Sequence, residues 1–281
     1  MTLTLAQRAA IETISPSKLD VWLRCQQQFA FVYFDGRRRP PSAAMAAGSA
    51  FDATANQSYV QQIATGDLPS GEDVRGQFAT SWDKFRRDVV EWGEEKPGDI
   101  LDSGTRASAA WRRVIAPAVR AIRVQVPVAF RVDTTDEADR TRNAALGIPD
   151  VFDLHGFADL EADVGGVRVI VDNKLKGKSM SDAEATRSLQ PPVYCGATGT
   201  SELQLHVAIR TKEPKTQVIR VAVGQTDIEY ARRIAARARR AIAVAARTGD
   251  VLPNRQHVMC SRRWCAFWED CQKTHGGTVA E

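Results

Sequence analysis

The 281-residue sequence lacks any apolar run long enough to cross a membrane. Its hydrophobic fraction of 43% is ordinary for a globular protein. No stretch reaches the roughly 20 apolar residues that a transmembrane helix needs. Residues 1–10 also lack the charged and apolar regions of a secretory signal. We therefore expect a cytoplasmic protein without a membrane segment.

Cysteine is scarce and unevenly distributed. The five cysteines are Cys25, Cys195, Cys260, Cys265 and Cys271. An odd number in a chain expected in the cytoplasm argues against a disulfide framework. The last three crowd into one short C-terminal segment, which indicates metal ligation.

Two common catalytic patterns are also missing. The sequence shows no Ser-His-Asp arrangement and no glycine-rich Walker loop for ATP phosphates. We therefore expect no ATP-driven helicase activity from these residues. Histidine is rare, and His155 and His206 fall in expected strands, where a structural role is the more common one.

Hydrophobic periodicity predicts helices in both terminal regions and strands in the middle. Helices are expected from Ser15 to about Tyr33 with Cys25 inside, at Ser42–Ile63, near Val74–Trp92 and Thr105–Ile122, from Ser181 or Asp182 to about Ala197, and at about Asp227–Ala246. Strands are expected around Val124–Val132, Phe152–Ala162, Val167–Asp172, Leu203–Ile209 and Gln217–Val223. This order predicts an α/β fold with a central mixed sheet flanked by helices. We divide it into a helical region 1–122, a core 123–248 and a cysteine segment 249–281.

Two carboxylates and a lysine face each other across a predicted hairpin. Asp159 lies in one strand, and Asp172 ends the next strand beyond the Gly165-Gly166 turn. Paired strands lie roughly 5 Å apart, so both carboxylates can share one hard cation. Lys174 follows Asp172 by two residues and therefore lies on the same face. This set suits phosphodiester hydrolysis, although surface charges on a hairpin would also explain an isolated Asp-x-Lys.

The order of motifs resembles the RecB-like PD-(D/E)XK nucleases. These have Gly-x-x-Asp, then Asp/Glu-x-Lys, then Gln-x-x-x-Tyr, and here the matching segments are 156–159, 172–174 and 190–194. The segments 14–19 and 48–52 also look like this family, except that Asp52 stands where a histidine is usual. The resemblance implies a restriction-endonuclease-like core.

The same resemblance implies roles for the site residues. It implies that Mg²⁺ or Mn²⁺ is held by Asp52, Asp159, Asp172 and the backbone carbonyl of Asn173. Lys174 would serve the attacking water, and Gln190 and Tyr194 would orient the substrate.

Within this family, the AddB-type and CRISPR-associated exonucleases join one N-terminal cysteine to three C-terminal ones. The resemblance therefore implies a [4Fe–4S] cluster on Cys25, Cys260, Cys265 and Cys271. Zinc on four cysteines, or on three cysteines with His257, is the alternative. Trp264, Phe267 and Trp268 are expected to shield the site, and Cys195 to be a packing residue.

Basic residues cluster in two places. One is the block 37–39, and the other is the helix that carries Arg232, Arg233, Arg237 and Arg240. We expect these four arginines to contact DNA phosphates, although a solvated helix face is the plainer interpretation.

Together these features predict a metal-dependent deoxyribonuclease, an exonuclease on single-stranded DNA or DNA ends. The resemblance implies phage recombination, DNA repair or CRISPR adaptation as its setting, with a protein partner or self-association possible there. The alternatives are a catalytically weak or inactive DNA-binding accessory protein, which Asp52 favours, and a zinc-stapled interaction protein.

Overall fold

The computed structural model describes residues 3–38, 41–89, 92 and 95–276. Within these ranges the chain forms two compact units, each assembled from separated segments. Unit 1 contains the segments 1–39, 129–156 and 225–281, and unit 2 contains 40–128 and 157–224. The three regions 1–122, 123–248 and 249–281 do not coincide with these units, because the chain passes between the units several times.

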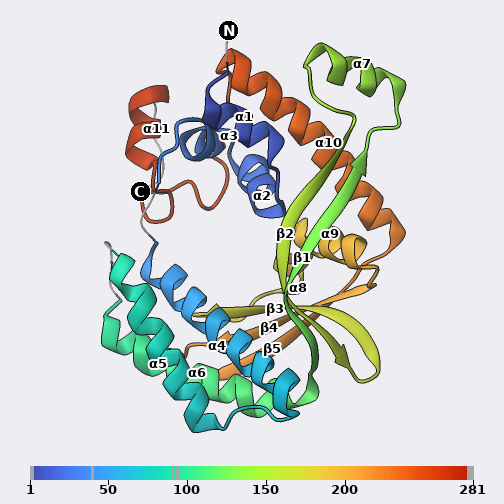
Figure 1. The fold of residues 1–281 in the computed structure, drawn as a ribbon. Coiled ribbons are helices and arrows are strands. Elements are labelled where there is room, and N and C mark those ends of the chain that lie inside the picture. The colour runs from blue at the N-terminus through green and yellow to red at the C-terminus, as the bar shows by residue number, and fades with distance from the viewer. Residues whose placement is uncertain (1–2, 39–40, 90–91, 93–94, 277–281) are drawn as a thin grey trace. The chain divides into compact units, whose positions relative to one another are not determined.

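Unit 2 contains a layer of three long helices. They are α4 (Ala43–Thr65), α5 (Gly71–Phe85) and α6 (Pro97–Val114), followed by the short helices η2 (Arg86–Asp88) and η3 (Ala116–Ala118). The hydroxyl of Ser42 caps α4, and that of Ser70 caps α5, each by accepting a backbone N–H. α4 lies against β3 (Val167–Lys176) and α6 lies against β4 (Glu202–Ile209) and β5 (Lys215–Ala222), while α5 packs on α4 and α6 (Figure 1).

The strands form one mixed sheet in the order β1-β2-β3-β4-β5. Their bounds are β1 (Arg120–Asp133), β2 (Val151–Val164), β3 (Val167–Lys176), β4 (Glu202–Ile209) and β5 (Lys215–Ala222). The β2–β3 and β4–β5 pairs are antiparallel, whereas β3 and β4 are parallel. The crossover between the parallel strands carries α8 (Asp182–Thr186) and α9 (Gln190–Thr198). The prediction of a mixed sheet flanked by helices is therefore confirmed.

The hairpin that joins β2 to β3 sets the register of the site. Gly165 and Gly166 have φ angles of 63° and 86°, which match the positive φ of a two-residue hairpin turn. The turn pairs Val164 with Val167, and the register continues to Leu160 and Val171. Asp159 and Asp172 are the next residues along each strand.

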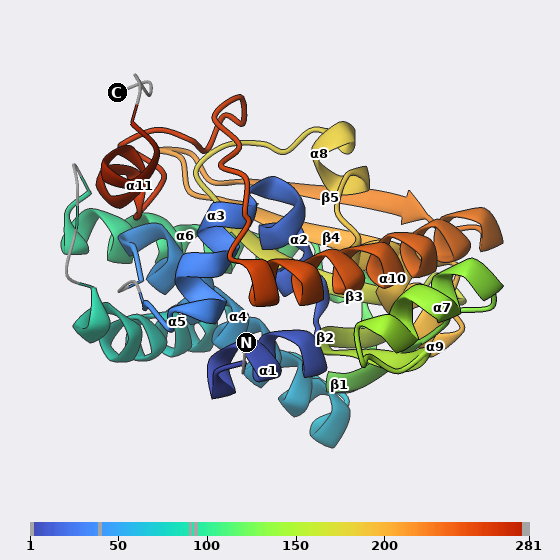
Figure 2. The same cartoon turned by 90° about the horizontal axis from the view of Figure 1, so that it is seen from above.

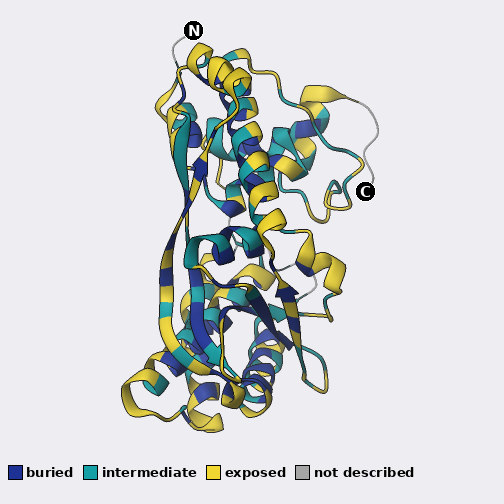
Figure 3. Cartoon of the chain, turned by 90° about the vertical axis from the view of Figure 1, so that its right-hand side faces the viewer, coloured by how far each residue is buried: buried dark blue, intermediate teal, exposed yellow. Residues whose placement is uncertain are grey.

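The core of unit 2 lies between the helices and one face of the sheet. Aromatic rings from the helices pack edge to face, with ring centroids of Trp111 5.6 Å from Phe51 and 5.5 Å from Tyr59. Val169 and Val171 of β3 belong to the same core. β4 is buried along almost its whole length, as the burial colours of this region illustrate (Figure 3). A packed sheet face of this kind fixes which side chains point away from it.

Unit 1 is mainly helical. Its helices are α1 (Leu5–Glu12), α2 (Pro16–Arg24), α3 (Gln26–Phe29), the π-helix η1 (Ala30–Phe34), α7 (Glu137–Ala145), α10 (Gln225–Thr248) and α11 (Trp268–His275). α1 and α2 lie beside α10 (Figure 2). The guanidinium of the buried Arg239 joins these segments, since it donates to the carbonyls of Ile11 and Pro149 and lies over the Phe152 ring.

Several element boundaries differ from the prediction. The helix expected near 74–92 ends at Phe85, and the one expected near 105–122 runs over Pro97–Val114. Pro97 opens that helix instead of breaking it, because a first-turn residue needs no backbone N–H. The helix expected to reach Ala197 is split into α8 and α9, because Pro191 and Pro192 fit only a first turn.

Cys25 does not lie inside a helix. α2 ends at Arg24, and Cys25 has extended backbone angles, φ −161° and ψ 111°, before α3 begins. Of the basic block 37–39, Arg39 lies outside the described residues. Among the described residues, no helix is both long and apolar enough to span a bilayer.

Candidate active site

Asp159 and Asp172 occupy neighbouring positions on β2 and β3, one residue beyond the Leu160–Val171 pair. Asp172 is 2% exposed, and the backbone N–H of Asn173 donates to Oδ2 of Asp159 across 2.9 Å. Burial, Asp172 and Asp52 together raise the pKa of Asp159 to about 7. The structure therefore brings the predicted carboxylates together in one electrostatically coupled site.

Lys174 neutralises part of this negative charge. Its Nζ lies 2.9 Å from Oδ1 and 2.7 Å from Oδ2 of Asp172. Burial alone would lower the pKa of Lys174, but its contact with Asp172 and the field of Asp159 raise it overall. Lys174 is thus a charged ammonium held beside the carboxylates.

Asp52 reaches the same site from α4. Burial raises the pKa of this carboxyl, and the negative charge of Asp172 raises it further. Its Oδ1 atom is buried and accepts no hydrogen bond from any described residue. The position that is usually a histidine therefore supplies a third carboxylate.

Gln190 of the third motif contacts Asp172, and Tyr194 interacts with Gln190. Nε2 of Gln190 donates to Oδ1 of Asp172 across 3.1 Å. A hydrogen bond from Gln190 also acts on the hydroxyl of Tyr194, although burial is the larger influence and raises the pKa of Tyr194. Both residues belong to α9, whose first turn contains the two prolines.

These residues fit a divalent cation. Asp172 raises the pKa of Asp52 and of Asp159, and Oδ1 of Asp52 is buried without a hydrogen-bond partner, so a bound cation would relieve both costs. Within the described residues, however, no three acidic, histidine or cysteine side chains form a closed metal-binding group. The three carboxylates are therefore a candidate cation site on the basis of their charge and their oxygen ligands.

Four cysteines line one cavity in unit 1. They are Cys25 from the α2–α3 junction, Cys260 and Cys265 from the C-terminal loop, and Cys271 from α11. Burial raises the pKa of Cys260 and Cys271, and the neighbouring thiols raise both further. The backbone N–H of Asn254 donates to Sγ of Cys25 across 3.5 Å. Four thiols around one cavity fit a metal group that prefers sulfur ligands.

The surroundings of this cavity only partly match the prediction. Phe267 is buried against Phe31, with ring centroids 5.2 Å apart, and Trp268 lines the cavity. Trp264 is 51% exposed and does not shield the site. His257 also lines the cavity, so the sequence alternative of three cysteines and a histidine stays open. Cys195 is fully buried in α9 of unit 2.

Comparison with known proteins places this geometry in a family. A profile described as the PD-(D/E)XK nuclease superfamily matches residues 13–272. The chain belongs to the PD-(D/E)XK nuclease superfamily.

Solved structures give weaker likenesses to this nuclease. A crystal structure from Eubacterium rectale, described as a candidate exonuclease, is 16% identical and aligns with a TM-score of 0.50 over 99% of this chain and 100% of that one. At this identity the likeness shows the fold alone. The structure of SSO0001, with 9% identity and a TM-score of 0.36 over 96% and 97% of the two chains, carries no argument. No curated protein matches the nuclease.

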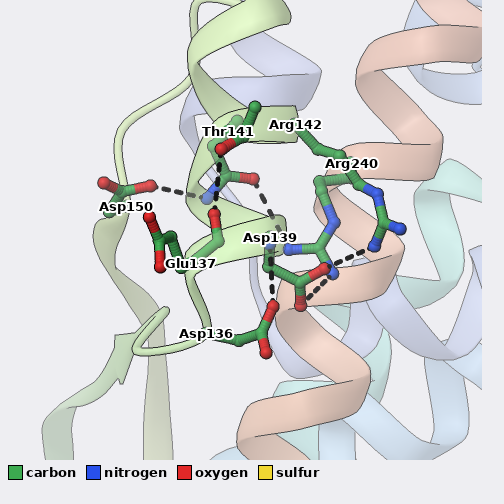
Figure 4. A network of polar contacts seen from close by, with 8 residues as sticks. Asp136, Glu137, Asp139, Thr141, Arg142, Asp150 and Arg240 are labelled. Carbon is green, nitrogen blue, oxygen red and sulfur yellow. Dashed lines mark hydrogen bonds and ion pairs between the residues drawn. The ribbon is translucent and has the colours of Figure 1, made fainter.

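The predicted DNA-binding arginines of the nuclease fall into two groups. Arg240 donates to Asp139 across 2.7 Å within a polar network of unit 1 (Figure 4). Arg232 donates to the carbonyl of Arg131 and lies over the Phe130 ring. Arg233 and Arg237 are exposed on α10. Intramolecular contacts thus hold Arg232 and Arg240, whereas Arg233 and Arg237 are exposed to solvent.

Sequence reasoning missed two features of the nuclease. Glu161, on the same face of β2 as Asp159, is 1% exposed and pairs with Arg123 and Arg168. Burial would raise the pKa of this glutamate, but the two guanidiniums lower it overall. The other feature is the contact of Asn254 with Cys25. Alternation from Asp159 predicts the face of Glu161, but nothing in the sequence indicates the contact across more than 200 residues.

Proposed function

We propose that this nuclease is a metal-dependent deoxyribonuclease that acts as an exonuclease on single-stranded DNA or on DNA ends. The observation that carries the proposal is the coupling of Asp52, Asp159 and Asp172 around one charged lysine. Such a set holds a hard divalent cation next to an ammonium. The family has this chemistry in common, and Mg²⁺ or Mn²⁺ suits an all-oxygen ligand set.

Each side chain of the site has its own role in the proposed hydrolysis. Asp52, Asp159 and Asp172 would hold the cation, with the backbone carbonyl of Asn173 as a further ligand. When bound, the cation supplies polarisation of the phosphoryl oxygen and a lowered pKa of a coordinated water. Lys174 orients the attacking water and offsets negative charge that develops on the phosphate. Gln190 keeps Asp172 in place through its hydrogen bond and, with Tyr194, lines the approach of the strand.

The cysteine cavity has a structural role in this proposal. Cys25, Cys260, Cys265 and Cys271 would bind one [4Fe–4S] cluster that ties the first helices to the C-terminal segment. The similarity of these spacings to AddB-type and CRISPR-associated exonucleases supports iron over zinc. It also supports phage recombination, DNA repair or CRISPR adaptation as the setting, with a partner protein there.

A cleavage assay tests the proposal. DNA labelled at either end, single-stranded or duplex, is incubated with the nuclease and Mg²⁺, Mn²⁺ or EDTA. We expect metal-dependent shortening from an end of the single strand and none in EDTA. Glu184→Ala, which removes an exposed carboxylate of α8, is the control that should cut normally. A nuclease that binds DNA but cuts nothing with either metal would support the accessory-protein alternative instead.

A further inference from the structure

One large aromatic side chain is exposed beside the carboxylates. Phe157 lies in β2, two residues before Asp159, and is 61% exposed. In the same stretch Ala158 and Leu160 are fully buried. Because side chains alternate along a strand, Phe157 and Asp159 share the outer face, with their Cα atoms roughly 7 Å apart.

Among the residues of unit 2 that the structure describes, Phe157 belongs to no buried cluster and pairs with no aromatic ring. Further along the same face are Asp159 and Glu161. Glu161 is neutralised by two arginines whose side chains are more than half exposed. The face therefore presents one flat apolar ring within a charged surface.

This combination fits a nucleobase better than a protein surface. A protein interface needs a contiguous apolar centre, which a single ring on a charged strand does not provide. A nucleotide has a flat π-face and a phosphate within the span of a few ångströms, and aromatic rings bind single strands by stacking on such faces. Inside a duplex, both faces of a base are already covered by its neighbours.

We infer that Phe157 forms a nucleobase-binding subsite that stacks on an unpaired base while the adjoining phosphate lies at Asp159 and Asp172. The inference rests on the proposed function and deepens it, because it makes unpaired nucleotides the preferred substrate. Stacking on Phe157 holds the strand at the carboxylates without reading its sequence.

The test compares binding of two strands of equal length and charge. One is an ordinary single-stranded oligonucleotide, and the other consists of abasic deoxyribose phosphates. Binding is measured in EDTA so that neither strand is consumed. Phe157→Ser should weaken binding of the ordinary strand about 10-fold. The same change should leave binding of the abasic strand, and of a blunt duplex, within about twofold.

Two further substitutions distinguish stacking on an aromatic ring from nonspecific contact with an apolar side chain. Phe157→Trp should retain binding of the ordinary strand, whereas Phe157→Leu, which keeps an apolar side chain without a π-face, should lose most of it. Val218→Ser, at another exposed apolar position of the sheet, is the control and should change nothing. A 2-aminopurine base in the strand should be quenched on binding to the wild type and not on binding to Phe157→Ser.

The outcomes are distinct from those of the cleavage assay. Equal losses with ordinary and abasic strands, no loss with Phe157→Ser, or no binding of single strands by the wild type would each overturn the inference. Failure of the nuclease to cut in Mg²⁺ or Mn²⁺, with base-dependent binding intact, would overturn the proposed function and leave the subsite standing.

Discussion

The backbone N–H of Asn173 donates a hydrogen bond to Oδ2 of Asp159 across 2.9 Å, which links β3 to the carboxylate of the neighbouring strand. The link lies one residue beyond the pairing of Leu160 with Val171. The main chain of Asn173, which follows Asp172, therefore holds the Asp159 carboxylate in place. The spacing of the two carboxylates is thus set by the backbone of the hairpin.

The role of Lys174 in cleavage should be separable from metal binding by substitution. Lys174→Ala should abolish most cleavage but retain Mn²⁺ binding, because the lysine donates no ligand to the cation. It should also lower the free energy of unfolding by roughly 1–3 kcal/mol, since it leaves the buried Asp172 carboxylate without its ion pair. Mn²⁺ titration and urea unfolding measure the two effects. Lys174→Arg, which keeps the charge, should recover most of the stability, and an equal loss in both variants would count against the ion pair.

His206 should make the protein sensitive to acid. Burial, and secondarily Arg220, lower the pKa of His206 to about 4, below the ordinary value of 6.5. Between these pH values the unfolded chain binds more protons than the folded one, so stability falls as pH falls. The loss should reach roughly 3 kcal/mol by pH 4.

Urea unfolding at pH 7 and near pH 4 measures this contribution. His206→Leu should be less stable than wild type at pH 7, because Gln204 loses its partner at 3.0 Å. Its further loss on acidification should be smaller by about the same 3 kcal/mol. Parallel pH curves for the two proteins would rule out His206 as the cause.

Removing one ligand from the cysteine cavity should destabilise unit 1. Anaerobically purified wild type should be brown and contain about four irons per chain. Cys265→Ala should lose the colour and unfold roughly 10 °C lower, because the bound group contributes to folding. Cys195→Ala, at the buried cysteine of unit 2, should keep its iron even if its packing suffers. Colourless protein with one zinc per chain would reject the cluster.

The exposed arginines of α10 should contribute to the salt dependence of DNA binding. Replacing Arg233 and Arg237 with glutamine should reduce the log–log salt slope for single strands by about 1.4. The matched control replaces Arg86 and Arg87, which are exposed and paired with Asp83. If both double variants have the same salt slope, Arg233 and Arg237 do not contact phosphates and lie on an ordinary solvated surface of α10.

Much of the fold and the site follows from local patterns in the sequence. Alternation and the Gly165-Gly166 turn predict the hairpin, and the hairpin alone predicts that Asp159 and Asp172 meet. The segment between Tyr59 and Ile122 has helical periodicity, but its helix ends depend on Pro97 and on where β1 begins. Local patterns do not decide such ends, because tertiary packing competes with propensity there.

Other features depend on contacts that are remote in sequence. The partial burial of Arg240 follows from its contact with Asp139, and the position of Asp52 follows from the packing of α4 on β3. The short helices α1, α7 and α11 were not predicted, because each has only 8 or 9 residues, too few for a clear period. The exposure of Phe157 is likewise a property of the folded sheet.

Asp172 is the centre of the account, since it contacts Lys174 and Gln190 and raises the pKa of Asp52 and Asp159. The most direct test is the cleavage rate of end-labelled single-stranded DNA in Mn²⁺ by wild type, Asp172→Ala and Glu184→Ala, with the unfolding temperature of each. We predict that Asp172→Ala remains folded, binds DNA at least as well and cuts at least about 1,000-fold more slowly, whereas Glu184→Ala cuts normally. A folded Asp172→Ala protein that cuts at the wild-type rate would contradict the assignment of this site.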